Sequence, residues 1–231
     1  MCFSATASFT ASGVLALLGG LTIHSATRQK HYLFLAITPF LFSIQQLAEG
    51  FVWFYVNQQD FSTARTFSVI FLFFALFFWI TWIPIVAYTV ETRTLFKRFF
   101  LVLSVIGFVF GLYLWLPTLL NSGPRHLISP YICHLQMCYK SMPDIYLKSY
   151  MRDLLYVSLG FLYLSCNDKI FRKFWIVVML AAILTRIFAA YAWASVWCFF
   201  AALSCLYLIY LIKQADYTDD KKKMSMQTGN S

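Results

Sequence analysis

Charged residues are scarce in this sequence, and that scarcity decides its class. Only 12% of the 231 residues are Asp, Glu, Lys or Arg, whereas 61% are hydrophobic and 20% are aromatic. So few polar side chains cannot coat a water-soluble globule, and we therefore expect the chain to be dissolved in lipid. The apolar segments take up nearly the whole length, which leaves no room for a separate soluble domain.

The sequence also lacks the motifs of nucleotide and nucleic-acid chemistry. It contains no glycine-rich loop ending in Gly-Lys-Ser/Thr, no dinucleotide-binding fingerprint and no nucleic-acid-binding module. We therefore expect neither a nucleotide nor a nucleic acid as a partner. The net charge of +9 sits in short clusters between apolar segments, which indicates membrane topology rather than a polyanionic partner.

Long apolar segments follow one another along the chain. Since about 20 residues cross the hydrocarbon core of a bilayer, this pattern predicts an all-α, polytopic integral membrane bundle. We predict about seven transmembrane helices, at residues 5–27, 32–56, 63–90, 96–118, 151–166, 172–188 and 191–212. The fifth segment is the shortest, so a re-entrant or interfacial segment is the alternative there.

Lys and Arg alternate between rich and poor loops, which predicts the orientation. The loops after the first, third, fifth and seventh segments hold most basic residues: Arg28, Lys30, Arg93, Lys97, Arg98, Lys169, Arg172, Lys173, Lys213 and Lys221–Lys223. Short cytoplasmic loops carry such an excess, so we predict an outside N-terminus and a cytoplasmic C-terminus. The predicted units are a transmembrane domain over 1–213, with a long external segment at 119–149, and a disordered cytoplasmic tail over 214–231.

An acidic side chain, Glu49, lies deep inside the second predicted transmembrane helix. Glu49 is about 25 Å along the second helix from Tyr32, in the outer third of the membrane. Gln45 and Gln46 precede it by four and three residues, so both amides lie beside the carboxylate on the helix surface. Ionisable groups in lipid are costly, which makes these three residues candidates for ligand binding. Plain hydrogen bonding between helices is the alternative.

Two cysteines are expected at the same outer side of the membrane. Cys2 lies at the outer edge of the first helix, and Trp197 and Cys198 lie about 10 Å into the seventh. Because thiolates favour soft or borderline ions, Cys2, Glu49 and Cys198 form a candidate site for copper or zinc, and Trp197 joins the candidate ligand pocket. The chain has no C-x-x-C or H-x-x-x-H pair, and close packing of small residues around Cys198 is the alternative.

Three separated blocks carry a family resemblance. They are the opening MCFSATASF, the QQLAEG run at Gln45–Gly50 and SVWCFFAALS at Ser195–Ser204. Together they resemble an uncharacterised family of bacterial multi-pass membrane proteins. The resemblance covers most of the chain and is weakest at 119–149. It implies a multi-pass fold in the bacterial inner membrane, and it implies no activity, because the family has none assigned.

The sequence leaves three kinds of function open. We place first the binding or transport of a small molecule or metal ion through a polar pocket in the outer half of the membrane. The second is a membrane-embedded enzyme that depends on a metal or a thiol, with Cys2 as nucleophile or ligand and Glu49 as general base. The third is a structural or assembly subunit in which these groups only join helices. In each case the expected surroundings are the lipid bilayer.

Overall fold

The structure is a computed structural model that describes residues 4–27, 29–120, 149–188 and 193–228. Within these ranges the chain is helical, with short connections and no strand. The α-helices are α1 (Ala5–Ala26), α2 (Leu33–Asn57), α3 (Phe61–Leu72), α4 (Trp79–Val90), α5 (Thr94–Leu120), α8 (Ser149–Leu162), α9 (Lys169–Phe188) and α10 (Trp193–Thr228). Two short 3₁₀ turns, η1 (Lys30–Tyr32) and η3 (Tyr163–Ser165), and one π-helix, η2 (Phe73–Phe78), complete the order.

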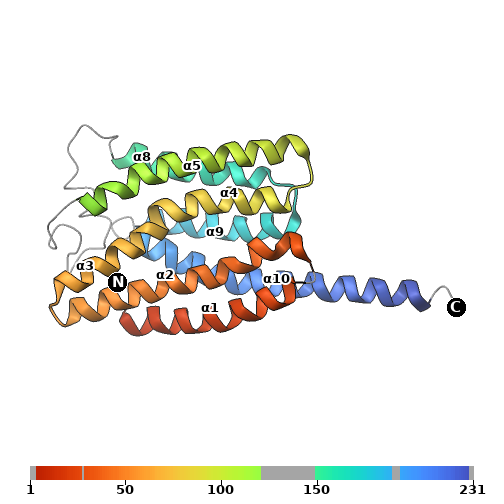
Figure 1. The fold of residues 1–231 in the computed structure, drawn as a ribbon, viewed down its shortest axis with the longest axis horizontal. Coiled ribbons are helices and arrows are strands. Elements are labelled where there is room, and N and C mark those ends of the chain that lie inside the picture. Colours follow the sequence, from red (N-terminus) through yellow and green to blue (C-terminus); the bar gives the residue numbers. More distant parts are fainter. Residues whose placement is uncertain (1–3, 28, 121–148, 189–192, 229–231) are drawn as a thin grey trace.

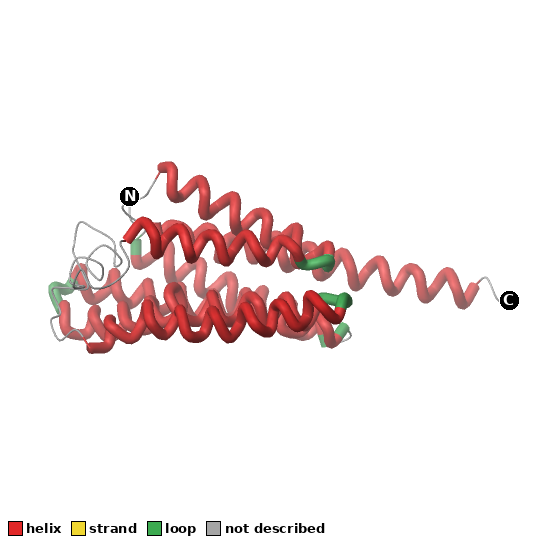
Figure 2. Tube along the Cα trace, turned by 90° about the horizontal axis from the view of Figure 1, so that it is seen from above, coloured by secondary structure: helices red, strands yellow, loops and turns green. Residues whose placement is uncertain are grey.

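The helices run side by side along the long axis of the molecule (Figure 1). α1 packs along α2, and α10 contacts α1, α2 and α9. α4 packs along α5 and also contacts α2 and α8, so that α2, α4, α8, α9 and α10 form a connected set of neighbours. Seen from above, α10 runs out past the ends of the other helices (Figure 2).

Five helical segments are long and apolar enough to cross a membrane. They are Ala5–Ala26, Lys30–Asn57, Phe61–Val90, Thr94–Leu119 and Val196–Ala215. The prediction of an all-α chain with several membrane-spanning helices is confirmed in this form. The two remaining predicted segments correspond to α8 with η3 and to α9; α8 has only 14 residues, and α9 carries basic residues in its first turns.

The last helix is longer than its predicted transmembrane segment. The sequence predicts a disordered tail from residue 214, whereas α10 continues to Thr228 and projects from the bundle (Figure 1). Extending an existing helix avoids the cost of nucleation, so polar residues can continue it without packing against the bundle. The tail as a separate unit stays a prediction.

Small residues let α1 and α2 approach closely. A Cβ on Gly19 would come within 2.8 Å of the backbone nitrogen of Phe40, so the two helices touch there through their main chains. Further along, the Ser12 hydroxyl donates a hydrogen bond to the Ser43 carbonyl at 2.8 Å. The two contacts set an antiparallel register between α1 and α2.

The π-helix η2 joins α3 to α4 without a break. Each π turn holds an extra residue compared with an α-helix, so η2 changes the direction in which the following side chains point. Trp79 is the first residue after it, and its ring stacks on Phe42 of α2 with centroids 3.9 Å apart. The π-helix thus sets the side of α4 that meets α2.

α5 meets α4 and the π-helix η2 at two glycines of α5. A Cβ on Gly107 would collide with the carbonyl oxygen of Ile80, and one on Gly111 would come within 2.8 Å of the Phe77 Cα. Glycine spacing of this kind is typical of close contacts between membrane helices, because it lets main chains approach.

We expect Gly107→Ala to destabilise the protein, because the added methyl group meets a main-chain atom of α4 that cannot move without shifting the helix. Such overpacking costs about 1–3 kcal/mol, so the midpoint of thermal unfolding in mild detergent should fall. Gly20→Ala is the matched control, since nothing lies within 4 Å of its Cβ position, and its midpoint should not fall. An unchanged midpoint for Gly107→Ala would contradict the close contact between α4 and α5.

Candidate functional site

The polar residues predicted on α2 are buried inside the bundle. Gln45, Gln46 and Glu49 are each 0% exposed. Residues three and four apart on a helix are surface neighbours, so both amides lie next to the carboxylate. The structure therefore turns all three side chains towards protein neighbours and away from lipid.

The two amides differ in their partners. Gln45 Oε1 accepts a hydrogen bond of 2.7 Å from the Trp79 indole N–H, which joins α2 to α4. Neither Nε2 nor Oε1 of Gln46 has a hydrogen-bond partner among the residues that the structure describes. A buried polar group without a partner costs about 1–3 kcal/mol. A bound water molecule or ligand that supplied the missing hydrogen bonds would recover that free energy.

Cys198 brings α10 to the same place. It is 5% exposed, and its thiol lies within hydrogen-bonding reach of the Gln45 side chain and close enough to Glu49 for an electrostatic interaction. The structure thus places Cys198 beside two of the predicted residues of α2. Cys2, the third predicted metal ligand, lies outside the described residues. We call Gln45, Gln46, Glu49 and Cys198 the α2–α10 cluster.

One further residue belongs near this cluster. The antiparallel register of α1 and α2 puts Ser8 level with residues 47–51, the turn that contains Glu49. Ser8 is fully buried, and its hydroxyl oxygen has no hydrogen-bond partner in the described part of the chain. The sequence predicts Ser8 only as part of a small-residue face of the first helix that packs against a neighbour, and that face was the available signal.

A cavity lies beside the cluster, between α2, α4, α8, α9 and α10. Cys198 is part of its wall, next to the predicted pocket residue Trp197. The other lining residues are Phe42, Trp79, Ile80, Ile83, Val157, Gly160, Tyr163, Phe174, Trp175, Val178, Met179 and Ala201. Sequence reasoning missed most of them, because aromatic residues make up 20% of the chain and no pattern marks the few that share a cavity.

The arrangement suits binding better than it suits a complete metal centre. Cys198 is the member of the α2–α10 cluster that lines the cavity, so its thiol, with a carboxylate and amides behind it, can fix one polar group of a mostly apolar ligand. Within the described ranges, no three His, Cys, Asp or Glu side chains come together as a group that could hold a metal ion. The copper or zinc hypothesis therefore depends on Cys2.

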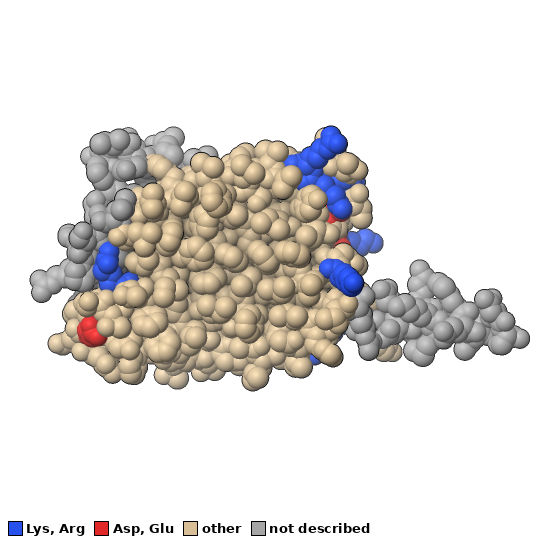
Figure 3. Space-filling view, in the orientation of Figure 1, with Lys and Arg blue, Asp and Glu red and all other residues tan. Residues whose placement is uncertain are grey.

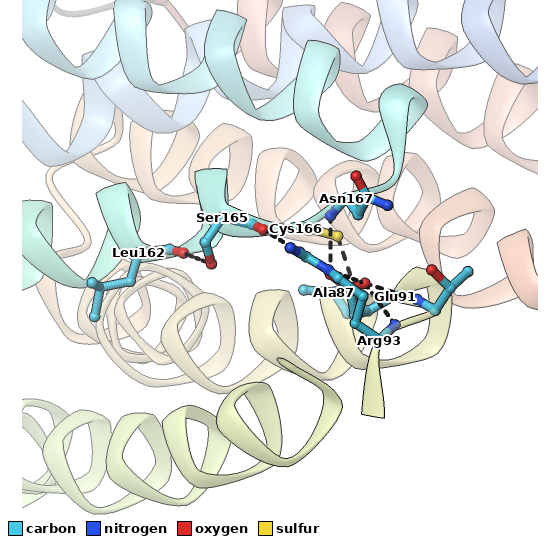
Figure 4. A network of polar contacts seen from close by, with 8 residues as sticks. Ala87, Glu91, Arg93, Leu162, Ser165, Cys166 and Asn167 are labelled. Atoms are coloured by element: carbon cyan, nitrogen blue, oxygen red, sulfur yellow. Dashed lines mark hydrogen bonds and ion pairs between the residues drawn. The ribbon is translucent and has the colours of Figure 1, made fainter. Parts of the chain in front are cut away.

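A second polar cluster lies between two loops at one end of the bundle (Figure 4). Glu91 directly follows α4, and its side chain is fully buried. Its carboxylate accepts hydrogen bonds of 2.8–3.0 Å from the backbone N–H groups of Thr92, Arg93 and Asn167 and from the Arg93 guanidinium. The guanidinium also donates to the Ser165 carbonyl at 2.6 Å. These bonds fasten the α4–α5 loop to the loop before α9.

Basic side chains gather at this same end of the molecule (Figure 3). The loop between α1 and α2 is attached there too, because the Tyr32 hydroxyl donates a hydrogen bond of 2.8 Å to Asp168. From the sequence, Arg93 indicates only membrane topology, and no pattern singles out Glu91. The available signal was an acidic residue two positions before an arginine in a loop that is otherwise basic or neutral.

The comparisons with known proteins give a family and no activity. A family model with the description "Family of unknown function (DUF6629)" matches residues 1–223. No curated protein and no solved structure matches the chain. The uncharacterised character of the family agrees with the resemblance stated above.

We expect Glu91 to stabilise the fold in a pH-dependent way. The hydrogen bond from the Arg93 side chain holds the pKa of Glu91 at about 2, below its ordinary 4.5, although burial acts in the opposite direction. Since the pKa is lower in the folded state, the ionised carboxylate stabilises the protein above about pH 4.5, and this contribution disappears as the pH falls towards 2.

Glu91→Gln should therefore lower the unfolding midpoint at pH 7, by an amount that corresponds to about 1–3 kcal/mol. The difference from wild type should shrink as the pH falls from about 4.5 towards 2. Arg93→Gln should remove the same pH dependence, because the Arg93 side chain is the main cause of the lowered pKa. An equal loss of stability at pH 7 and at pH 3 would mean that Glu91 acts through its shape and not through its charge.

Proposed function

The chain belongs to the family of unknown function DUF6629, and we propose from its site alone that it binds a small molecule inside the helix bundle. The ligand occupies the cavity between α2, α4, α8, α9 and α10. The Cys198 thiol, which lies beside Gln45 and Glu49, holds one polar group of that ligand. If the bound ligand is released on the opposite side of the membrane, the same site would serve transport.

The observation that carries the proposal is an incomplete polar cluster next to an apolar cavity. Gln46 is buried with both amide atoms lacking a partner in the described structure, which a purely structural hydrogen-bond network would avoid. Cys198 lies beside Gln45 and Glu49 of the cluster and also lines the cavity. A ligand in the cavity would thus reach polar groups at one place only, which is the usual design of a small-molecule site.

A structural role is the second candidate, and one observation favours it. The bond between Trp79 and Gln45 joins α2 to α4, as polar side chains of membrane helices commonly do.

The thiol- or metal-dependent enzyme depends on Cys2, as does binding of copper or zinc, because Glu49 and Cys198 alone offer too few ligands.

We also propose the finer topology. Seven passes, with α8–η3 and α9 as the fifth and sixth, an outside N-terminus and a cytoplasmic C-terminus would put the basic end of the bundle in the cytoplasm. The transmembrane domain covers residues 1–213 and the cytoplasmic tail covers 214–231. The family resemblance supports the bacterial inner membrane as the location.

The orientation is tested with single cysteines in an otherwise cysteine-free full-length chain. Ser62 and Thr92 are exposed at opposite ends of the segment Phe61–Val90, so they form a matched pair. A membrane-impermeant maleimide should label Ser62→Cys in intact cells and Thr92→Cys only after lysis. Tyr217→Cys should behave like Thr92→Cys, because four further crossings return the chain to the cytoplasm. The reverse pattern would invert the topology, and a difference between positions 92 and 217 would rule out an even number of crossings between them.

Ligand binding is tested on protein purified in mild detergent. Native mass spectrometry for small molecules and elemental analysis for copper and zinc should detect a ligand retained by wild type, and Glu49→Gln and Cys198→Ala should lose it. Cys205→Ala is the matched control, since Cys205 is equally buried on α10 but does not line the cavity. A wild type without ligand, with both site variants less stable than Cys205→Ala, would favour the structural role.

A further inference from the structure

The cavity wall is rich in aromatic rings, and its polar atoms are few. Among its lining residues, the side chains that carry a polar hydrogen are Trp79, Tyr163, Trp175, Trp197 and Cys198. All other lining positions are aliphatic, phenylalanine, methionine or glycine. Whether these five polar groups are available decides which class of ligand the cavity can take.

The indole and phenol groups already have partners in the protein. Trp79 donates to Gln45 Oε1 at 2.7 Å and Trp175 to the Gly160 carbonyl at 2.7 Å. Trp197 donates to the Val178 carbonyl at 3.3 Å, and the Tyr163 hydroxyl donates to a carbonyl of α4 at 3.4 Å. Each aromatic residue therefore turns its polar edge into the wall and leaves ring carbons to line the cavity.

A polar ligand would lose its own hydration in such a space without gaining hydrogen bonds from these rings. Burying an amide or hydroxyl without a hydrogen bond costs about 1–3 kcal/mol in proteins, and the cost applies to every such group. An apolar ligand carries no such cost and gains dispersion contacts with the rings. The exception is the wall at Cys198, whose thiol is a weak hydrogen-bonding group next to Gln45 and Glu49.

We propose that the ligand of this cavity is an apolar molecule with a ring or alkyl body and at most one polar group, placed beside Cys198. This inference rests on the proposed binding function and names its ligand class. The aromatic faces hold the body of the ligand, and Cys198, the member of the α2–α10 cluster in the wall, meets its single polar group. Ligands with several hydrogen-bonding groups, such as sugars or free amino acids, are excluded by the same wall.

The probe for the test is a small neutral aryl diazirine, which forms a carbene on illumination and labels whatever lies next to it. Peptide mass spectrometry of the labelled full-length protein should find adducts on Met179 and Cys198, which are 3% and 5% exposed and thus shielded from lipid. A carboxylate-bearing aryl diazirine of the same size is the polar comparison, and it should leave both residues unlabelled.

Two cavity variants separate this labelling from background labelling by probe dissolved in the detergent. Ala201→Leu fills the cavity from α10, and Gly160→Ala pushes on Met179, whose sulfur lies 2.8 Å from the new Cβ. Either variant should reduce labelling of Cys198 by about tenfold, because the side chain takes the place of the probe. Leu203→Phe, at a 40% exposed position on the same helix, should leave labelling unchanged.

Labelling by the carboxylate probe in preference to the neutral one would overturn the apolar class, as would adducts confined to lipid-facing residues. The ligand class and the proposed binding function can be refuted independently of each other. A wild type that retains a polar ligand, lost in Cys198→Ala, would keep the binding function and refute only the ligand class. A wild type that takes up the neutral probe but retains no native ligand would leave the apolar cavity in place and count against the binding function.

Discussion

The structure depends on one constraint: inside a bilayer, polar groups must find their partners within the protein. α2 carries two amide side chains and one carboxyl group at its centre, and lipid offers none of them a hydrogen bond. The bundle meets the constraint by surrounding that part of α2 with α1, α4 and α10. Trp79 supplies a donor from α4 and Cys198 a thiol from α10, so the polar face of α2 determines which helices become its neighbours.

The cluster around Glu91 and the α2–α10 cluster differ in how completely their polar atoms are hydrogen-bonded. At the basic end, every oxygen of Glu91 is used by donors from two loops, which is what a structural fastening requires. In the α2–α10 cluster, Gln45 is bonded through Oε1, whereas neither amide atom of Gln46 has a partner in the described structure. A complete network stabilises the fold by itself, while an incomplete one gains stability when something else binds. That contrast is the reason for assigning structure to one cluster and binding to the other.

Backbone features far from the polar groups give the cavity its shape. The π-helix η2 turns Trp79 towards Phe42 and Gln45, and the glycines of α5 bring α5 close to η2 and α4. Gly160 leaves room for Met179 at the wall, because a Cβ there would meet its sulfur at 2.8 Å. These small residues and the π turn place aromatic rings around a space that none of them fills.

The sequence by itself determined the solvent of the chain, the helical class and the candidate residues on α2. Composition and segment length suffice for the first two, because they follow from the free energy of burying apolar surface and from the thickness of a bilayer. The position of Glu49 in an apolar segment was enough to single it out, since helical spacing places Gln45 and Gln46 beside it.

Tertiary structure alone decided which residues meet from distant segments. Neither the bond between Trp79 and Gln45, nor the fastening of Asn167 to Glu91, nor the choice of aromatic residues around the cavity has a local signal. Such contacts depend on which helices are neighbours and on how each is rotated, and a sequence with 20% aromatic residues offers many equivalent pairings before packing selects one.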